Sequence, residues 1–152
     1  MTTAILAAGE TNWNRLAGPF QEAIVDTLVM VGTTLVIGGL CGLILGMLLY
    51  TTRAGGVLQN KFIFGLLNIL VNFVRPIPFI ILLVTLGPLT KALVGSQIGR
   101  DAAIVGMSVA ATFGVARIVE QNLVTIDPGM IEAARAMGAS PWQIITGVII
   151  RE

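Results

Sequence analysis

The chain has 152 residues, 55% of them hydrophobic and only 11% charged, whereas soluble domains carry about 25% charged residues, so the composition indicates a protein of the lipid bilayer. Its net charge of +1 provides no basic surface for a nucleic acid partner,. The sequence has no histidine and a single cysteine, Cys41, which argues against an enzyme, a cofactor site, a metal site and an internal disulfide.

Residues 1–22 are expected to form an N-terminal lead-in to the membrane. The first residues are apolar but lack the positive n-region of a secretory signal, and the segment from Glu10 to Phe20 is polar with glycine and proline,. A first membrane span is predicted over residues 23–50, with Asp26 near its start and no charged residue after it. This length exceeds the roughly 20 residues that cross the hydrocarbon core.

Three glycines recur every four residues in this span: Gly38, Gly42 and Gly46, with Cys41 as a small packing neighbour. The spacing places them on one face of a helix, where small residues let a second helix approach closely. That helix belongs either to the same chain or to a second copy. Because glycine is frequent in membrane helices generally, internal packing is the favoured interpretation.

Two further spans are predicted after a short loop that contains Gly55 and Gly56. An apolar stretch covers residues 62–86, and a connecting loop with Pro88 leads from it to Asp101. The third span covers residues 102–118. Its many small residues are typical of a helix that packs among other helices rather than facing lipid.

Arg75 interrupts the second stretch, together with Pro76 and Pro78. A charge at the centre of a membrane helix costs about 2.5–3.5 kcal/mol on insertion scales, and the two prolines disfavour a continuous helix. Such a break is tolerated inside protein or beside a water-filled cavity. Two interpretations stay open: the helix bends here around a translocation path, or Arg75 snorkels or pairs with an acid of a neighbouring helix and only fixes the fold.

The basic residues suggest an orientation. With three spans, the 51–61 loop and the 117–152 tail share one side of the membrane. That side has five basic residues against three on the other, which favours a cytoplasmic tail,. The five are Arg53, Lys61, Arg117, Arg135 and Arg151, and the three are Arg15, Lys91 and Arg100.

The tail predicts two short helices over residues 128–150. Asp127 is a good N-cap and is followed by proline, which suits a first helical position,. Gly138 supplies the left-handed residue that ends the first helix. Ser140 and Gln143 have the spacing of a capping box and start the second helix,.

This helix pair is expected to bind another protein. Glu132 either forms a weak exposed pair with Arg135 or faces the partner. A helix-turn-helix for DNA has a similar outline, but residues 127–150 contain one basic residue against two acids,. The predicted contact surface for a protein combines an apolar stripe with an aromatic anchor: Met130, Ile131, Ala134, Met137 and Trp142,.

These segments resemble a known family. Glu132-Ala133-Ala134, followed by Gly138-Ala139, resembles the EAA loop of ABC importer permeases. The segment Phe73–Leu83, with Arg75 and Pro78, resembles the Arg-x-x-Pro signature in helix two of amino-acid permeases of this class. Three blocks look more narrowly like methionine ABC importer permeases: Ile77–Val84, Ala102–Val105 and Ile131–Ile144.

The resemblance implies an all-α polytopic protein of the bacterial inner membrane, in which the three predicted transmembrane helices are followed by a cytoplasmic pair of coupling helices. It implies that residues 23–152 form the transmembrane domain of a homodimeric importer for D- or L-methionine. Two ATPase subunits and an extracytoplasmic methionine-binding protein are the implied partners, and the chain's lack of a P-loop assigns ATP hydrolysis to the ATPase,. The residues that match the coupling motif are Glu132, Ala133, Ala134, Gly138 and Ala139.

Two features depart from the family pattern. Ile150-Arg151 stands where the family has Leu-Pro, and the two spans that follow the coupling loop in the family are expected to be missing. No substrate-binding residue is therefore assigned. The alternatives are a truncated protein that docks an ATPase without transport, and a permease for another amino acid.

Overall fold

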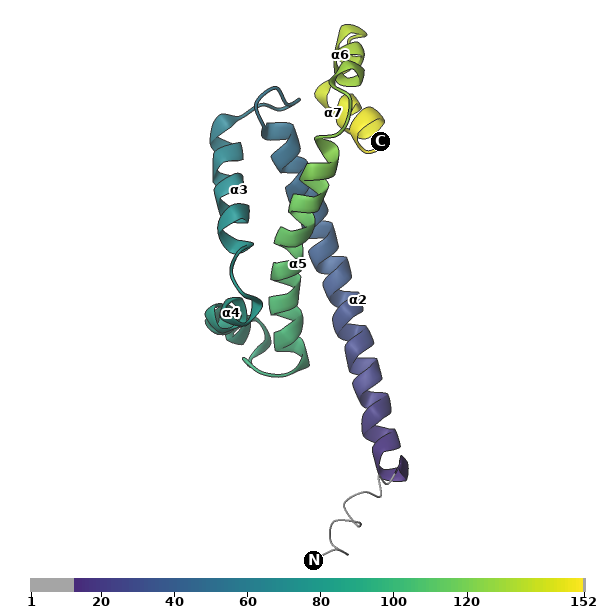
Figure 1. The fold of residues 1–152 in the computed structure, drawn as a ribbon, viewed down its shortest axis with the longest axis vertical. Coiled ribbons are helices and arrows are strands. Elements are labelled where there is room, and N and C mark those ends of the chain that lie inside the picture. Colours follow the sequence, from purple (N-terminus) through teal and green to yellow (C-terminus); the bar gives the residue numbers. More distant parts are fainter. Residues whose placement is uncertain (1–12, 152) are drawn as a thin grey trace, which may run out of the picture.

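The computed structural model describes residues 13–151, and within that range the secondary structure consists of helices joined by short loops, with no β-strand. The all-α fold that the family resemblance implied is confirmed. Two long helices form the centre of the fold: α2 (Trp13–Thr52) and α5 (Arg100–Leu123). Their chains run in the same direction, and the two helices cross at an angle (Figure 1). Both are long and apolar enough to cross a membrane,.

The first span is longer than predicted. α2 begins at Trp13 and its candidate span begins at Leu16, so residues 13–22 continue the helix rather than form a separate lead-in. Once a long apolar helix exists, each further residue adds a hydrogen bond without a new nucleation cost, and this overrides the local polarity and Pro19,. Residues 1–12, and with them the expectation about the first residues, lie outside the described part of the chain.

The glycine face of α2 packs against α5 of the same chain. Gly38, Gly42 and Gly46 are buried. A Cβ at Gly38 would lie 2.6 Å from Ala111 Cβ, and one at Gly46 would lie 2.6 Å from the carbonyl oxygen of Ala116. Because α5 fills this face, a second copy has no access to it in this arrangement. Cys41, expected to pack beside the glycines, is exposed instead.

The second apolar stretch is broken into two helices. α3 (Lys61–Val74) starts at Asn60, whose side chain accepts hydrogen bonds from two backbone N–H groups, and α4 (Phe79–Val94) starts after Pro78. The two helices are bent by 115° with respect to each other. The described residues therefore contain two straight candidate spans, and a third if the bent pair counts as one.

The prediction of a connecting loop around Pro88 is wrong. α4 continues through Pro88 to Val94, and Gly95 ends it with a φ of 78°. Neighbouring helices can compensate for a proline inside a membrane helix, and the buried residues Gly87 and Thr90 show that this part of α4 faces protein. The loop is therefore limited to the few residues between α4 and α5.

The third span also extends beyond its expected end at residue 118. α5 continues to Leu123 and includes Arg117 and Glu120, whose side chains form an ion pair of 2.5 Å. This pairing explains why two charged residues did not end the helix. At the other end of α5, Arg100 forms an exposed ion pair of 2.9 Å with Asp26 of α2.

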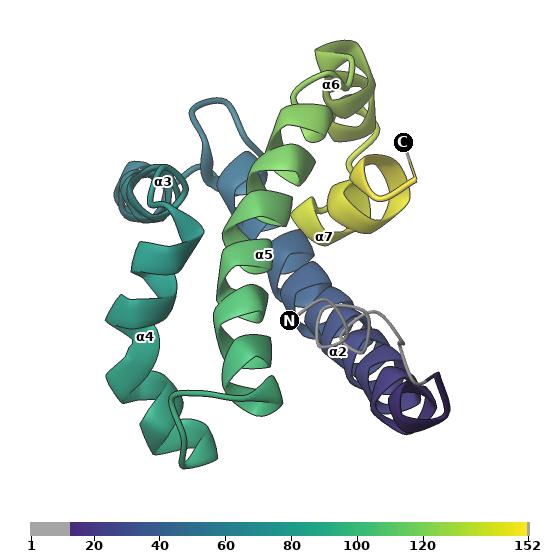
Figure 2. The same ribbon diagram turned by 60° about the horizontal axis from the view of Figure 1, so that its bottom comes forward.

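The chain ends in a compact group of short helices: α6 (Pro128–Ala136), α7 (Pro141–Ile144) and the π-helix η1 (Ile145–Ile149). In Figures 1 and 2, α3 and α4 lie on one side of α5 and α7 lies on the other. The short helices are at the same end of the molecule as the α2–α3 connection (Figure 1). This is the shared side that the three-span topology predicts.

Candidate docking site at the carboxyl-terminal helix pair

The start of α6 is fixed by its cap. The Asp127 side chain accepts a hydrogen bond of 2.8 Å from the backbone N–H of Gly129. Pro128 occupies the first helical position, where a missing N–H costs nothing,. The sequence-based start of this helix is confirmed.

A Schellman motif ends α6 and sets the direction of the next helix. Gly138 has a φ of 82°, the left-handed conformation predicted for it. Its N–H donates to the carbonyl of Arg135, and the N–H of Ala139 donates to that of Ala134, both at 3.0 Å,. The turn is thus held by its own backbone hydrogen bonds.

The second helix starts as predicted but continues differently. Ser140 and Gln143 form the full capping box: the Ser140 N–H donates to Gln143 Oε1 at 2.8 Å, and the Gln143 N–H donates to Ser140 Oγ at 3.4 Å. α7 then gives way to η1 at Ile145. A π-helix winds more loosely than an α-helix, and such segments are frequent at functional sites.

The helix pair is anchored by one hydrophobic cluster. Ala134, from the EAA motif, is 7% exposed and belongs to a buried group at the end of α2. Ile131 and Ala139 pack against the same group. The buried members of the cluster are Tyr50, Ala134, Ile144, Ile145 and Ile149.

The remaining motif residues point outward. Glu132 and Ala133 are exposed, and so are Met137 at 82% and Trp142 at 72%. The expected apolar stripe is therefore divided, because Ile131 and Ala134 face the body of the protein while Met137 faces solvent. The outer surface of the helix pair consists of Glu132, Ala133, Met137 and Trp142.

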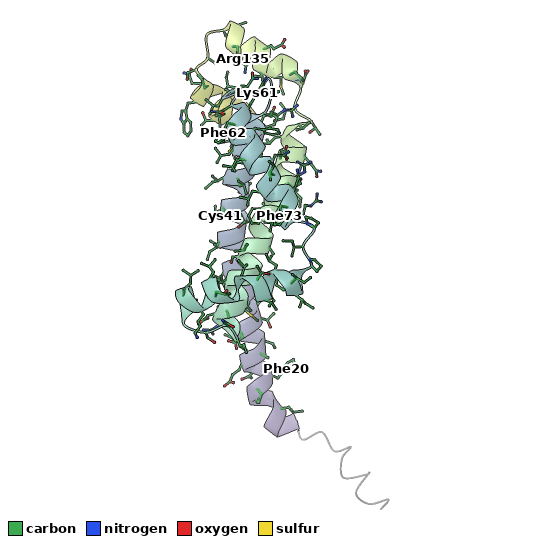
Figure 3. The ribbon with its side chains drawn as sticks, turned by 90° about the vertical axis from the view of Figure 1, so that its left-hand side faces the viewer. Phe20, Cys41, Lys61, Phe62, Phe73 and Arg135 are labelled. Atoms are coloured by element: carbon green, nitrogen blue, oxygen red, sulfur yellow. The ribbon has the colours of Figure 1, made fainter. Side chains whose placement is uncertain are left out.

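Arg135 links α6 to the α2–α3 connection. Its guanidinium donates a hydrogen bond of 3.1 Å to the carbonyl oxygen of Gly56. The possible pair between Glu132 and Arg135 is not among the ion pairs of residues 13–151. Figure 3 shows Arg135 at the end of the molecule opposite Phe20.

A cleft of about 250 Å³ lies between α6 and this connection and includes Glu132 and Arg135. Tyr50 and Arg53 also line it, with the Arg53 guanidinium 5.6 Å from the centre of the Tyr50 ring,. Sequence reasoning did not assign Tyr50, Arg53 or Gly56 to the site. The Gly55-Gly56 turn was visible as a signal, but no local pattern shows that it meets a helix 79 residues later.

The helix-two signature lies apart from the docking surface. Arg75 follows the last residue of α3 as its C-cap, and Pro78 precedes the first residue of α4. Both side chains are exposed. The structure therefore separates two candidate sites: the helix pair at one end, and the helix break that Arg75 marks.

Residues 38–152 match the model of the family described as "Binding-protein-dependent transport system inner membrane component". Similar curated proteins include the D-methionine transport system permease protein MetI of Yersinia pestis, 47% identical over 131 residues, and that of Escherichia coli strain K12, 45% identical over 131 residues. Each comparison covers 86% of this chain and 60% of the relative. The chain thus spans about 60% of the length of these relatives.

The fold is also similar to that of a solved transporter. A structure described as inward facing conformations of the MetNI methionine ABC transporter superposes with a TM-score of 0.80 and 44% identity, over 85% of this chain and 60% of that chain. A second crystal form gives a TM-score of 0.79, also at 44% identity, over 84% of this chain and 59% of that chain. These findings agree with the resemblance that the EAA motif and the Arg-x-x-Pro signature indicated.

Proposed function

Since the chain belongs to the family of inner membrane components of binding-protein-dependent transport systems, we propose that it is a permease subunit of an ATP-driven methionine importer. The observation that carries this proposal is that two residues of the EAA motif are exposed on a helix pair whose two helices both have N-terminal caps. Glu132 and Ala133 face solvent, while Ala134 is held in the hydrophobic cluster. The names of the relatives support methionine as the substrate.

The proposed partners follow from this role. Two ATPase subunits dock on the helix pairs of a permease homodimer at the cytoplasmic face, and an extracytoplasmic binding protein delivers methionine. The outer surface of Glu132, Ala133, Met137 and Trp142 provides one charge and large apolar groups for the ATPase contact. Aromatic and Met side chains are enriched in the cores of such interfaces.

The mechanism we propose is alternating access driven by rigid-body motion. When the two ATPase subunits close, each helix pair moves as a unit because its turn and caps are fixed by backbone hydrogen bonds. The hydrophobic cluster joins the pair to α2 through Tyr50, and Arg135 joins it to the α2–α3 connection. The motion thus reaches the spans instead of being absorbed in a flexible loop.

Uptake by reconstituted vesicles tests the proposal. The protein is assembled with its ATPase in proteoliposomes, and accumulation of radiolabelled D- and L-methionine is measured with the binding protein and ATP. We expect methionine to accumulate only when both the binding protein and ATP are present. A non-hydrolysable ATP analogue in place of ATP is the control and should give no accumulation. A complex that assembles and hydrolyses ATP but accumulates no methionine would be a docking protein only. Stronger accumulation of another amino acid would identify a different permease.

A further inference from the structure

A second cleft lies at the helix break, remote from the docking site. It has a volume of about 250 Å³ and is formed by the end of α3, the first turn of α4 and the middle of α5. Arg75 is the one charged residue among those that line it. The others are apolar: Val74, Ile77, Phe79, Leu82, Ala110, Phe113 and Gly114.

The cleft lies beside the middle of α5, the candidate membrane span Arg100–Leu123. From Arg100, where α5 begins, Ala110 is ten residues further along the helix, a rise of about 15 Å,. That is about half of the roughly 30 Å of hydrocarbon in a bilayer. Lipid phosphates lie at the membrane surface, so they are poorly placed to neutralise a cation at this depth.

Arg75 has no acid as a partner in the part of the chain that the structure describes. The ion pairs of residues 13–151 involve Arg100 and Arg117 instead. The pairing of Arg75 with an acid of a neighbouring helix, one of the two sequence-based interpretations, is therefore not found there. A charged side chain at this depth marks a substrate or ion pathway in membrane proteins more often than a structural element.

The chemistry of the cleft selects a class of ligand. A guanidinium binds a carboxylate in a bidentate manner, and Phe113 and Leu82 offer apolar contacts to an uncharged side chain,. The break also places the carbonyl end of α3 next to the amide end of α4, which favour a cation and an anion respectively,. This combination fits a zwitterionic amino acid with an apolar side chain.

We propose that the cleft binds the transported amino acid during its passage, with Arg75 contacting the carboxylate and Phe113 the side chain. This inference rests on the proposed function. It adds a substrate site to the permease, where sequence reasoning assigned none. It also explains the chemistry of the Arg-x-x-Pro segment: the prolines break the helix, and the break exposes Arg75 to the pathway.

Photo-crosslinking tests the site directly. The complex with its ATPase and binding protein is illuminated during ATP-driven uptake of a diazirine analogue of methionine, and the modified peptides are mapped by mass spectrometry. We expect labelling within residues 77–82 and 110–114. Unlabelled methionine should suppress it, whereas methioninamide, which lacks the carboxylate, should not.

Two kinds of variant separate charge from shape. Arg75→Gln should reduce the labelling about tenfold or more, the factor expected when a charge-assisted hydrogen bond is lost, and Arg75→Lys should restore part of it. Gly114→Leu should place an apolar side chain in the cleft while the charge of Arg75 is kept, and a Cβ at Gly114 meets no heavy atom within 4 Å. Gly32→Leu is the matched control, since Gly32 has equally open surroundings in α2 and does not line the cleft.

The outcomes separate a failure of the proposed substrate site from a failure of the proposed importer function. Co-purification of the ATPase confirms that a variant has folded and assembled. If the protein accumulates methionine but the analogue labels other segments, or if Arg75→Gln labels as strongly as the unmodified protein, the site is refuted while the importer stands. If the unmodified complex accumulates no methionine, the proposed function fails and the site fails with it.

Discussion

The left-handed conformation of Gly138, in the turn between α6 and α7, allows the effect of Gly138→Val to be predicted quantitatively. Gly138 has a φ of 82°, and a Cβ added there would meet no heavy atom within 4 Å. The effect of the substitution is therefore confined to the backbone conformation, without a contribution from crowding. A residue with a side chain held in this region costs about 1–3 kcal/mol, and a β-branched side chain lies at the upper end. This cost corresponds to about a 5- to 150-fold shift away from the native turn.

The strain should displace the second half of the helix pair. If the turn opens, the hydrogen bonds from Gly138 to Arg135 and from Ala139 to Ala134 are lost, and Ile144 leaves the hydrophobic cluster. We expect faster amide hydrogen exchange at Ala139, weaker co-purification of the ATPase and reduced methionine uptake. The fold of α2 and α5 should remain intact, because they do not depend on this turn.

Two controls make the test specific. Gly138→Asn should be nearly neutral, since asparagine tolerates the left-handed region. Gly147→Val adds the same side chain in η1, also in open space but without a positive φ, and should leave the turn intact. The reasoning would be refuted if Gly138→Val showed unchanged hydrogen exchange, ATPase co-purification and uptake, or if the asparagine variant were equally impaired.

Three further predictions concern docking, packing and charge. Glu132→Gln should reduce ATPase co-purification while changing stability by less than about 0.5 kcal/mol, because the side chain is exposed,; a large fall in melting temperature would contradict this. Gly42→Val should destabilise the protein by about 1–3 kcal/mol or more through overpacking against α5, whereas Gly39→Val should not, because a Cβ at Gly39 meets no heavy atom within 4 Å,. Thermal unfolding in detergent compares the two variants. Glu120→Ala should destabilise by about 3–5 kcal/mol, because its partner would be left charged and partly buried,. Asp26→Asn removes an acid from the half-exposed pair with Arg100 and should leave the melting temperature unchanged,. If Glu120→Ala and Asp26→Asn lowered the melting temperature equally, burial would not determine the strength of these ion pairs.

The amino-acid sequence by itself determined the features that depend on near neighbours. The caps at Asp127 and Ser140 and the left-handed Gly138 are set by residues within one or two turns, and all three were predicted correctly. The break of the second stretch was also predicted, because Pro76 and Pro78 act on their own backbone. Membrane character follows from composition alone.

Only the tertiary structure decided features that depend on distant contacts. The continuation of α4 through Pro88 was not predicted, because packing against other helices overrides a local breaker,. The partner of the glycine face was undecided until α5 was seen to fill it, since spacing shows that a helix approaches closely but not which one. The bond from Arg135 to Gly56 joins residues that are 79 positions apart, and the cleft at Arg75 is closed by α5. Periodicity and capping act over a few residues, so they define the helices, while the sites arise where those helices meet.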